Sequence, residues 1–185
     1  MEGITDGTSN TIAFSEGIIF DRNLSAKGGN KKARIAVGVA DTGNFTGIPT
    51  NCLAVADGKN LKADQDASNT ANDIYHQLGM RAFDWYVFGM AFYTLMPPNS
   101  PSCTYQAQGS WVGDVWVSAS SNHTGGVNAS MMDGSVQFVS DTIGTQNLGR
   151  GSTSRSTPQD AAGPFSYGIW ASLGSINGGE SASIP

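Results

Sequence analysis

Short stretches in which apolar and polar residues alternate recur along the chain, and this pattern predicts β-strands. The stretches cover residues 12–19, 34–40, 112–119, 127–131 and 136–139, and an unbroken apolar run predicts a buried strand over 85–96. Polar, glycine-containing segments at 21–32 and 41–60 are predicted to be loops. Asp133 and Gly134 lie between the last two alternating stretches, which is a strong signal for a β-hairpin.

One segment has the spacing of an amphipathic helix, which we predict over 66–78, with Gly79 suited to the position after its end. A short helix is expected within 167–173, a mobile loop over 144–163 and a frayed tail over 178–185. We therefore expect a single globular domain over 1–185. Its predicted fold class is α+β, with an antiparallel sheet, one amphipathic helix and long loops. The apolar face of the helix consists of Ala67, Ala71, Ile74, Tyr75 and Leu78.

The composition narrows the class of protein. The chain has a net charge of −5 and only 14% charged residues, which argues against nucleic acid as a partner. No apolar run is long enough to span a membrane, and the N-terminal residues lack the basic and apolar regions of a signal peptide. A low charge with many Gly, Ser, Thr and Asn residues is typical of exported proteins.

The two cysteines, Cys52 and Cys103, both lie in segments that read as loops. Free structural cysteines prefer apolar burial, so a disulfide formed in an oxidising compartment is the favoured interpretation. Two unrelated reduced thiols are the alternative. A catalytic thiol is disfavoured because neither cysteine has basic neighbours that would lower its pKa.

The most specific feature is the segment SSNHTGGVNASMMDGSVQFVSDTI at 120–143, in which nine residues separate His123 from Asp133-Gly134. Across a hairpin the Asp133 carboxylate could orient the His123 imidazole, as in two members of a hydrolytic triad. Ser15, Ser120 or Ser121 would then have to act as the nucleophile, although no nucleophile-elbow motif is present. The alternatives are a buried, hydrogen-bonded structural histidine and a turn in which Asp133 accepts backbone N–H bonds.

Three further segments accompany this motif: ITDGTSNTIAFSE at 4–16, LMPPNSPSC at 95–103 and YGIWASLGSINGGE at 167–180. Together they resemble the bacterial pseudopilin-like and type IV pilin-like proteins with a prepilin-type, processing-associated H-x(9)-D-G C-terminal domain. Members of that family begin with a cleavage site and a long apolar helix, which this sequence lacks. The resemblance implies an extracytoplasmic pseudopilin head whose partners are other pilin-like or type II secretion-apparatus subunits.

Relatives among the major pseudopilins bind calcium near their C-terminal strands, so the resemblance also implies a calcium site here. Calcium takes oxygen ligands, and the candidate ligands near the predicted terminal strands are Asp114, Asp133, Asp141, Asn128 and Ser140.

Three functions are therefore expected. The first is an exported pilin-like structural or assembly protein, stabilised by calcium and a disulfide. The second is a calcium-dependent hydrolase of an ester or lactone, with His123 and Asp133 as catalytic residues. The third is a secreted glycan-binding module that presents aromatic side chains, among them Trp85, Trp111, Trp116 and Trp170.

Overall fold

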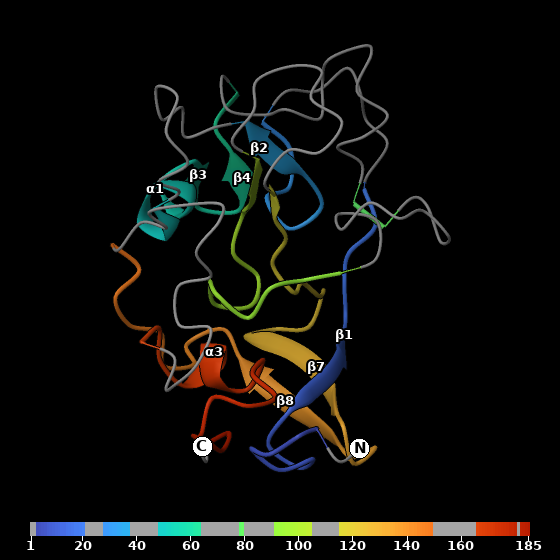
Figure 1. Cartoon of the computed structure of the whole chain (residues 1–185). Coiled ribbons are helices and arrows are strands. Elements are labelled where there is room, and N and C mark those ends of the chain that lie inside the picture. The colour runs from blue at the N-terminus through green and yellow to red at the C-terminus, as the bar shows by residue number, and fades with distance from the viewer. Residues whose placement is uncertain are drawn as a thin grey trace.

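The computed structural model describes residues 3–20, 28–37, 48–63, 78–79, 91–104, 115–149, 166–180 and 182–185. Within these ranges the fold is α+β, with mainly antiparallel strand pairs, two short helices and long loops, which confirms the predicted class (Figure 1). The predicted amphipathic helix over 66–78 lies outside the described residues except for Leu78. No helix in the described ranges is long and apolar enough to cross a membrane.

The first sheet has the strand order β1-β7-β8 and is antiparallel throughout. Its strands are β1 (Ile12–Ser15), β7 (Gly126–Met131) and β8 (Val136–Ser140). β7 and β8 form the predicted hairpin, and Gly134 takes a φ of 86° in its turn, a backbone conformation that glycine adopts without steric cost. The Asp133 carboxylate accepts hydrogen bonds from the backbone N–H and the hydroxyl of Ser135, as a turn aspartate does.

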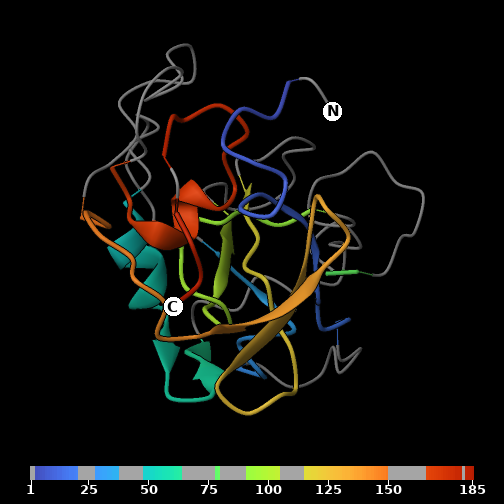
Figure 2. The same cartoon turned by 90° about the horizontal axis from the view of Figure 1, so that it is seen from below.

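One face of this sheet forms the larger hydrophobic core. Every second side chain of a strand points to the same face of the sheet. The inward-facing side chains are covered by Trp170 of α3 (Ile169–Ser172) and by Leu173, which follows α3. The Trp170 ring stacks on Phe92 with 6.5 Å between the ring centroids. Figure 2 shows α3 beside the β7–β8 hairpin. The inward-facing strand residues are Ile12, Val127, Ala129, Met131 and Val139.

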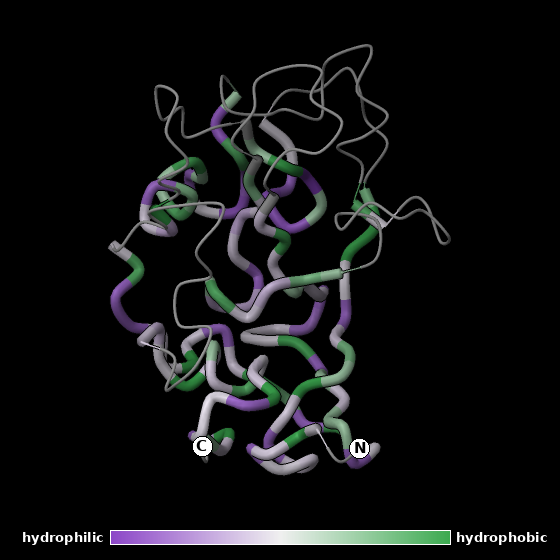
Figure 3. The backbone as a smooth tube through the Cα atoms, in the orientation of Figure 1, coloured by the Kyte–Doolittle hydropathy of each residue, from purple (hydrophilic) through white to green (hydrophobic). Residues whose placement is uncertain are grey.

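The second half contains the sheet β2-β5-β6, made of β2 (Ile35–Val37), β5 (Ser102–Thr104) and β6 (Val115–Trp116). β2 and β5 are parallel, whereas β5 and β6 are antiparallel. Beside them lie the helix α1 (Pro49–Leu53) and the small hairpin of β3 (Ala56–Asp57) and β4 (Asn60–Leu61) (Figure 1). Figure 3 shows hydrophobic stretches in both halves of the chain.

Two local predictions were wrong. The predicted loop over 41–60 contains α1 and the β3–β4 hairpin, because Pro49 suits a first helical turn and Cys52 anchors the helix to the core. Residues 91–96 at the end of the predicted strand 85–96 form bends and irregular backbone. Their apolar side chains serve separate clusters, since Phe92 packs with Trp170 and Met96 with the cluster around Cys52.

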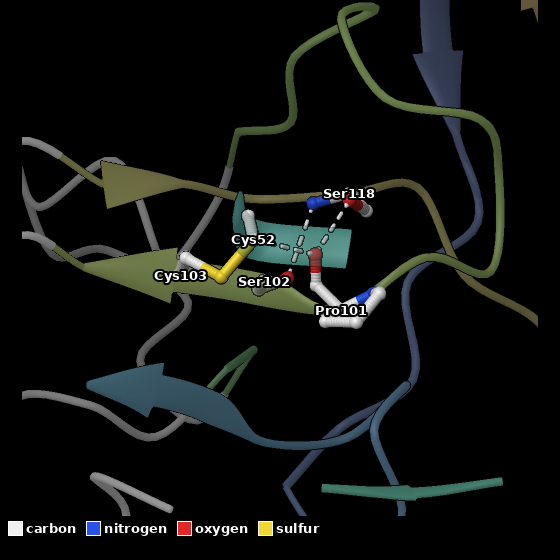
Figure 4. Close-up of a disulfide and its surroundings, with 5 residues drawn as sticks. All are labelled: Cys52, Pro101, Ser102, Cys103 and Ser118. Atoms are coloured by element: carbon white, nitrogen blue, oxygen red, sulfur yellow. Dashed lines mark hydrogen bonds between the residues drawn. A yellow bond between two sulfur atoms is a disulfide. The ribbon is translucent and has the colours of Figure 1, made fainter. Parts of the chain in front are cut away.

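A disulfide joins Cys52 of α1 to Cys103 of β5, with 5.9 Å between the Cα atoms, and confirms the predicted pair (Figure 4). Both cysteines are buried within the second hydrophobic cluster rather than lying in exposed loops. Next to the disulfide, the Ser118 backbone N–H donates to Ser102 Oγ and the Ser118 hydroxyl donates to the Pro101 carbonyl. The cross-link therefore ties α1 to the second sheet at a well-packed position.

Candidate functional site

A hydrogen-bonded group of polar side chains lies at the junction of β1, β7 and the loop before β7. We call it the Glu16 cluster, and it consists of Glu16, His123 and Asn128. The Glu16 carboxylate accepts the Asn128 backbone N–H at 2.8 Å and the Asn128 side-chain amide at 3.2 Å. The His123 Nε2 atom lies 3.1 Å from Glu16 Oε1 and 3.1 Å from Asn128 Nδ2. Nε2 donates to Glu16 when it carries a hydrogen and otherwise accepts from Asn128.

The surroundings of Glu16 favour its charged form. Burial raises the pKa of the Glu16 carboxyl, but the two Asn128 hydrogen bonds and the charge and hydrogen bond of His123 outweigh it and hold the pKa below the ordinary value of 4.5. A carboxylate that accepts several hydrogen bonds resists protonation. The cluster thus joins the end of β1 to β7 with an ionised acceptor.

The predicted pairing of His123 with Asp133 is not formed. His123 precedes β7 and Asp133 follows it, so a six-residue strand separates them, a length of about 20 Å at strand rise. Glu16 occupies the position beside the imidazole that Asp133 was predicted to take. His123 is also not a buried residue, since 56% of its side chain is exposed. Sequence reasoning missed Glu16 because its proximity to His123 depends on the pairing of β1 with β7.

The side-chain hydroxyls of the three serines considered as nucleophiles form hydrogen bonds with backbone groups. Ser120 Oγ accepts the Ile18 N–H, and the Ser121 hydroxyl donates to the Gly126 carbonyl at 2.7 Å. The Ser15 hydroxyl donates to the Asn128 carbonyl at 3.3 Å. Among the described residues, none of these hydroxyls forms a hydrogen bond with the His123 imidazole. These hydroxyls therefore tie backbone segments together around the Glu16 cluster.

The predicted calcium ligands are divided among separate places. Asp133 lies in the turn before β8, whereas Ser140 and Asp141 lie at the other end of that strand, about 16 Å away at strand rise. Asn128 contributes to the Glu16 cluster, and Asp114 lies outside the described residues. Within the described ranges no group of three or more His, Cys, Asp or Glu side chains could hold a metal ion. Calcium binding stays a prediction.

The predicted aromatic row is also only partly described. Trp170 is fully buried and Trp116 packs against the cluster around the disulfide. Trp85 and Trp111 lie outside the described residues. Trp170 therefore belongs to the core and Trp116 packs at its edge. Glycan binding stays a prediction.

The segments near the two ends of the chain meet beside the first sheet. The Asp6 carboxylate accepts the backbone N–H groups of Gly178 at 2.7 Å and Gly179 at 2.9 Å. The Thr5 N–H donates to the Ile176 carbonyl at 2.8 Å. The bonds from Gly178 and Gly179 lie within 178–185, for which a frayed tail was predicted, and Ala182 and Ile184 pack against the core there, so the described part of this stretch is not frayed. The hydrogen bond from Gly178 is the largest effect that lowers the pKa of Asp6.

The turn of the β7–β8 hairpin joins the same place. The Asp133 N–H donates to the Thr8 carbonyl and the Met132 N–H donates to the Thr11 carbonyl. The Thr11 hydroxyl lies within hydrogen-bond distance of the Gly7 and Ser175 carbonyls. Three motif segments that are far apart in the sequence, 4–16, 120–143 and 167–180, are therefore packed together as one structural unit.

A family described as a protein of unknown function, DUF1559, matches residues 1–146, more than three quarters of the chain. The chain belongs to the DUF1559 family. This family is associated with prepilin and pilin-like proteins. No curated protein and no solved structure matches the sequence.

The first sheet of this DUF1559 chain leaves its second face uncovered by the described residues. We call it the outer face. Phe14 and Val136, which are 73% and 67% exposed, flank Ser130 in one row across the three strands. Phe138, which is 49% exposed, lies opposite Asn128 in the next row. The Phe138 ring covers Gly126, where an added Cβ would meet both the ring and the Val139 carbonyl.

None of the side chains that the strands turn outward is charged, although the DUF1559 chain carries a net charge of −5. Phe14, Val136 and Phe138 thus give this face several exposed apolar side chains, and a large exposed apolar patch is a feature of interaction surfaces. The Glu16 cluster borders the outer face through Asn128 and fixes the strands that carry it. The outward-facing residues are Phe14, Asn128, Ser130, Val136, Phe138 and Ser140.

Proposed function

We propose that this chain is the head of an exported pilin-like protein, with the H-x(9)-D-G segment as its C-terminal sheet, and that it acts by assembly rather than by catalysis. The partner we infer for the outer face is a second copy of the same chain. The observation that carries the proposal is the exposed, uncharged outer face on a sheet that the motif segments build.

A second copy fits this face because of charge. Two molecules that each carry −5 repel one another over most of their surfaces. The outer face is a place where few like charges meet, since the outward side chains of its three strands are apolar or neutral and the Glu16 carboxylate lies at its border. Its serine and asparagine side chains can hydrogen-bond across such a contact.

The contact between two heads is expected to be weak. Phe14, Val136 and Phe138 together expose roughly 300 Å² of side chain, judged from the typical area of a buried aromatic residue. A stable interface buries about 800 Å² on each partner. Association through this face is therefore expected to be weak and reversible, and to appear only at high protein concentration.

The buried disulfide supports export. Disulfides persist in oxidising compartments and are rare in the cytosol, and the bond between Cys52 and Cys103 lies in the core of the second half. An extracytoplasmic location, beside other pilin-like or secretion-apparatus subunits, is therefore the location that we propose.

Sedimentation velocity of the purified chain over a concentration series tests the proposal. We expect reversible self-association at high concentration, which Phe14→Ser weakens because it removes the most exposed apolar side chain. Ile176→Ser is the matched control, since Ile176 is 51% exposed but lies outside the first sheet. The proposal fails if the wild-type chain stays monomeric, or if both variants weaken association equally.

A further inference from the structure

A hollow of about 650 Å³ lies where the β3–β4 hairpin meets the segments around residues 31, 98, 122 and 141. We call it the lysine pocket, because Lys31, Lys32 and Lys59 all line it. It shares no lining residue with the outer face. The inference below is therefore independent of the proposed assembly function.

Backbone pairing brings the lysines together. The Lys31 N–H donates to the Lys59 carbonyl at 3.1 Å, and Asn30 forms a β-bridge with Asn60. The β3–β4 turn and the segment before β2 are therefore held side by side. The Lys32 ammonium is fixed on the third side, where it donates to the Ser121 carbonyl at 2.8 Å.

The pocket is electropositive in an acidic protein. Three of the ten Lys and Arg residues of the chain line it, and within the described ranges none of the three forms an ion pair with a carboxylate. Burial lowers the pKa of Lys32, the charge of Asp141 opposes this, and the charges of Lys31 and Lys59 lower the pKa further. The charges of Lys31 and Lys59 thus act on the Lys32 ammonium, and an anion bound beside Lys32 would offset their repulsion.

The remaining lining groups select the kind of anion. Asn60 and Asn122 add amide groups that can both donate and accept hydrogen bonds. The described lining contains no aromatic side chain on which a base could stack and no arginine that could grip a phosphate in a bidentate manner. The volume also exceeds that of a single small anion and lies in the range of organic ligand sites.

We propose that the lysine pocket binds an acidic oligosaccharide made of uronate units. A carboxylate of the ligand would lie between Lys31 and Lys59, and its hydroxyl groups would bond to Asn60 and Asn122. Asp141 lines the same hollow near Lys32. Its carboxylate repels the ligand's carboxylate from that side and can accept a sugar hydroxyl, so it gives the bound ligand one orientation.

Isothermal titration of the full chain with tetragalacturonate tests this site, with maltotetraose as the neutral probe and inorganic phosphate as the simple anion. We expect tetragalacturonate to bind, with an affinity that falls as salt rises, because the lysine contacts are screened. The double variant Lys31→Ala/Lys59→Ala should bind at least tenfold more weakly. Both positions are in a turn or loop, so the fold should persist, which circular dichroism verifies.

Lys62→Ala is the matched control, because Lys62 is an exposed lysine close in sequence to Lys59 that does not line the pocket. Unchanged affinity in Lys62→Ala together with the loss in the double variant supports the site. The inference is overturned if tetragalacturonate does not bind, or if Lys62→Ala weakens it as much as the double variant does. Equal binding of maltotetraose or displacement by millimolar phosphate also overturns it, since either result removes the need for a uronate chain.

Discussion

Removal of the Cys52–Cys103 disulfide should cost a large part of the stability of the protein. The two cysteines are 51 residues apart, and closing a loop of that length in the unfolded chain removes entropy worth about 4 kcal/mol at 25 °C. Domains are typically stable by about 5–15 kcal/mol. A chain of this size loses about 2–4 °C of unfolding midpoint per kcal/mol, so a fall of about 8–16 °C is expected.

Thermal unfolding followed by circular dichroism, with and without a phosphine reductant, measures this effect. The chain contains only these two cysteines, so the reduced protein cannot form a wrong pair within one molecule. The double variant Cys52→Ala/Cys103→Ala should unfold near the reduced wild-type protein. It should not respond to the reductant, which separates the loss of the cross-link from any other action of that compound.

The entropic reasoning fails if the midpoint falls by less than about 3 °C while thiol titration finds two free thiols per chain. Such a result would mean that residual structure in the reduced, unfolded chain restricts it about as much as the bond does. A fall of the expected size would instead mean that the protein needs the disulfide to remain stably folded. That requirement favours an oxidising compartment for this chain.

Three further predictions concern the first sheet. Gly126→Ala should lower the unfolding midpoint in a thermal scan, because the added Cβ meets a carbonyl across the hairpin and the Phe138 ring; an unchanged midpoint would contradict this packing. The Glu16 carboxyl has a folded-state pKa below 4.5, so its contribution to stability is present above that pH and is lost as the pH falls through the folded-state pKa. The stability difference between wild type and Glu16→Gln, from urea unfolding at several pH values, should therefore shrink in acid, and a constant difference would refute this origin. Asp133 and Asp141 lie at opposite ends of β8. If Asp141 binds calcium, Asp133→Asn should therefore leave the calcium-dependent rise of the unfolding midpoint unchanged. Loss of that rise in both Asp133→Asn and Asp141→Asn would instead mean that the two residues share one site.

The hairpin could be predicted from the sequence because all of its information is local. The two alternating apolar stretches and the Asp133-Gly134 pair between them lie within about one hairpin's length of sequence. The turn also needs a positive φ, which Gly134 supplies. The short helix within 167–173 followed from a similarly local cluster of apolar residues. In contrast, α1 was missed because five residues carry too little periodicity for a helix, and its stability comes from the disulfide and from burial.

The candidate site could be predicted only in part, because it depends on contacts between distant segments. Nine residues separate His123 from Asp133, and the strand predicted over 127–131 lies between them, so its extended length keeps the two side chains apart. Glu16 is 107 positions from His123, and only the antiparallel pairing of β1 with β7 brings them together. The bonds from Gly178 and Gly179 to Asp6 are longer in range still. Local sequence patterns do not show which distant segments pair with one another.

Photo-crosslinking at position 138 tests the proposed assembly most directly. Phe138 is replaced by p-benzoylphenylalanine, which keeps an aromatic ring on the outer face, and the oxidised protein is irradiated over a concentration series. The account predicts a product of twice the chain mass whose linked peptides come from β1, β7 or β8 of a second copy, and a much lower yield from the same replacement at Ile176. No doubled product at position 138, or an equal yield from position 176, would contradict assembly through the outer face.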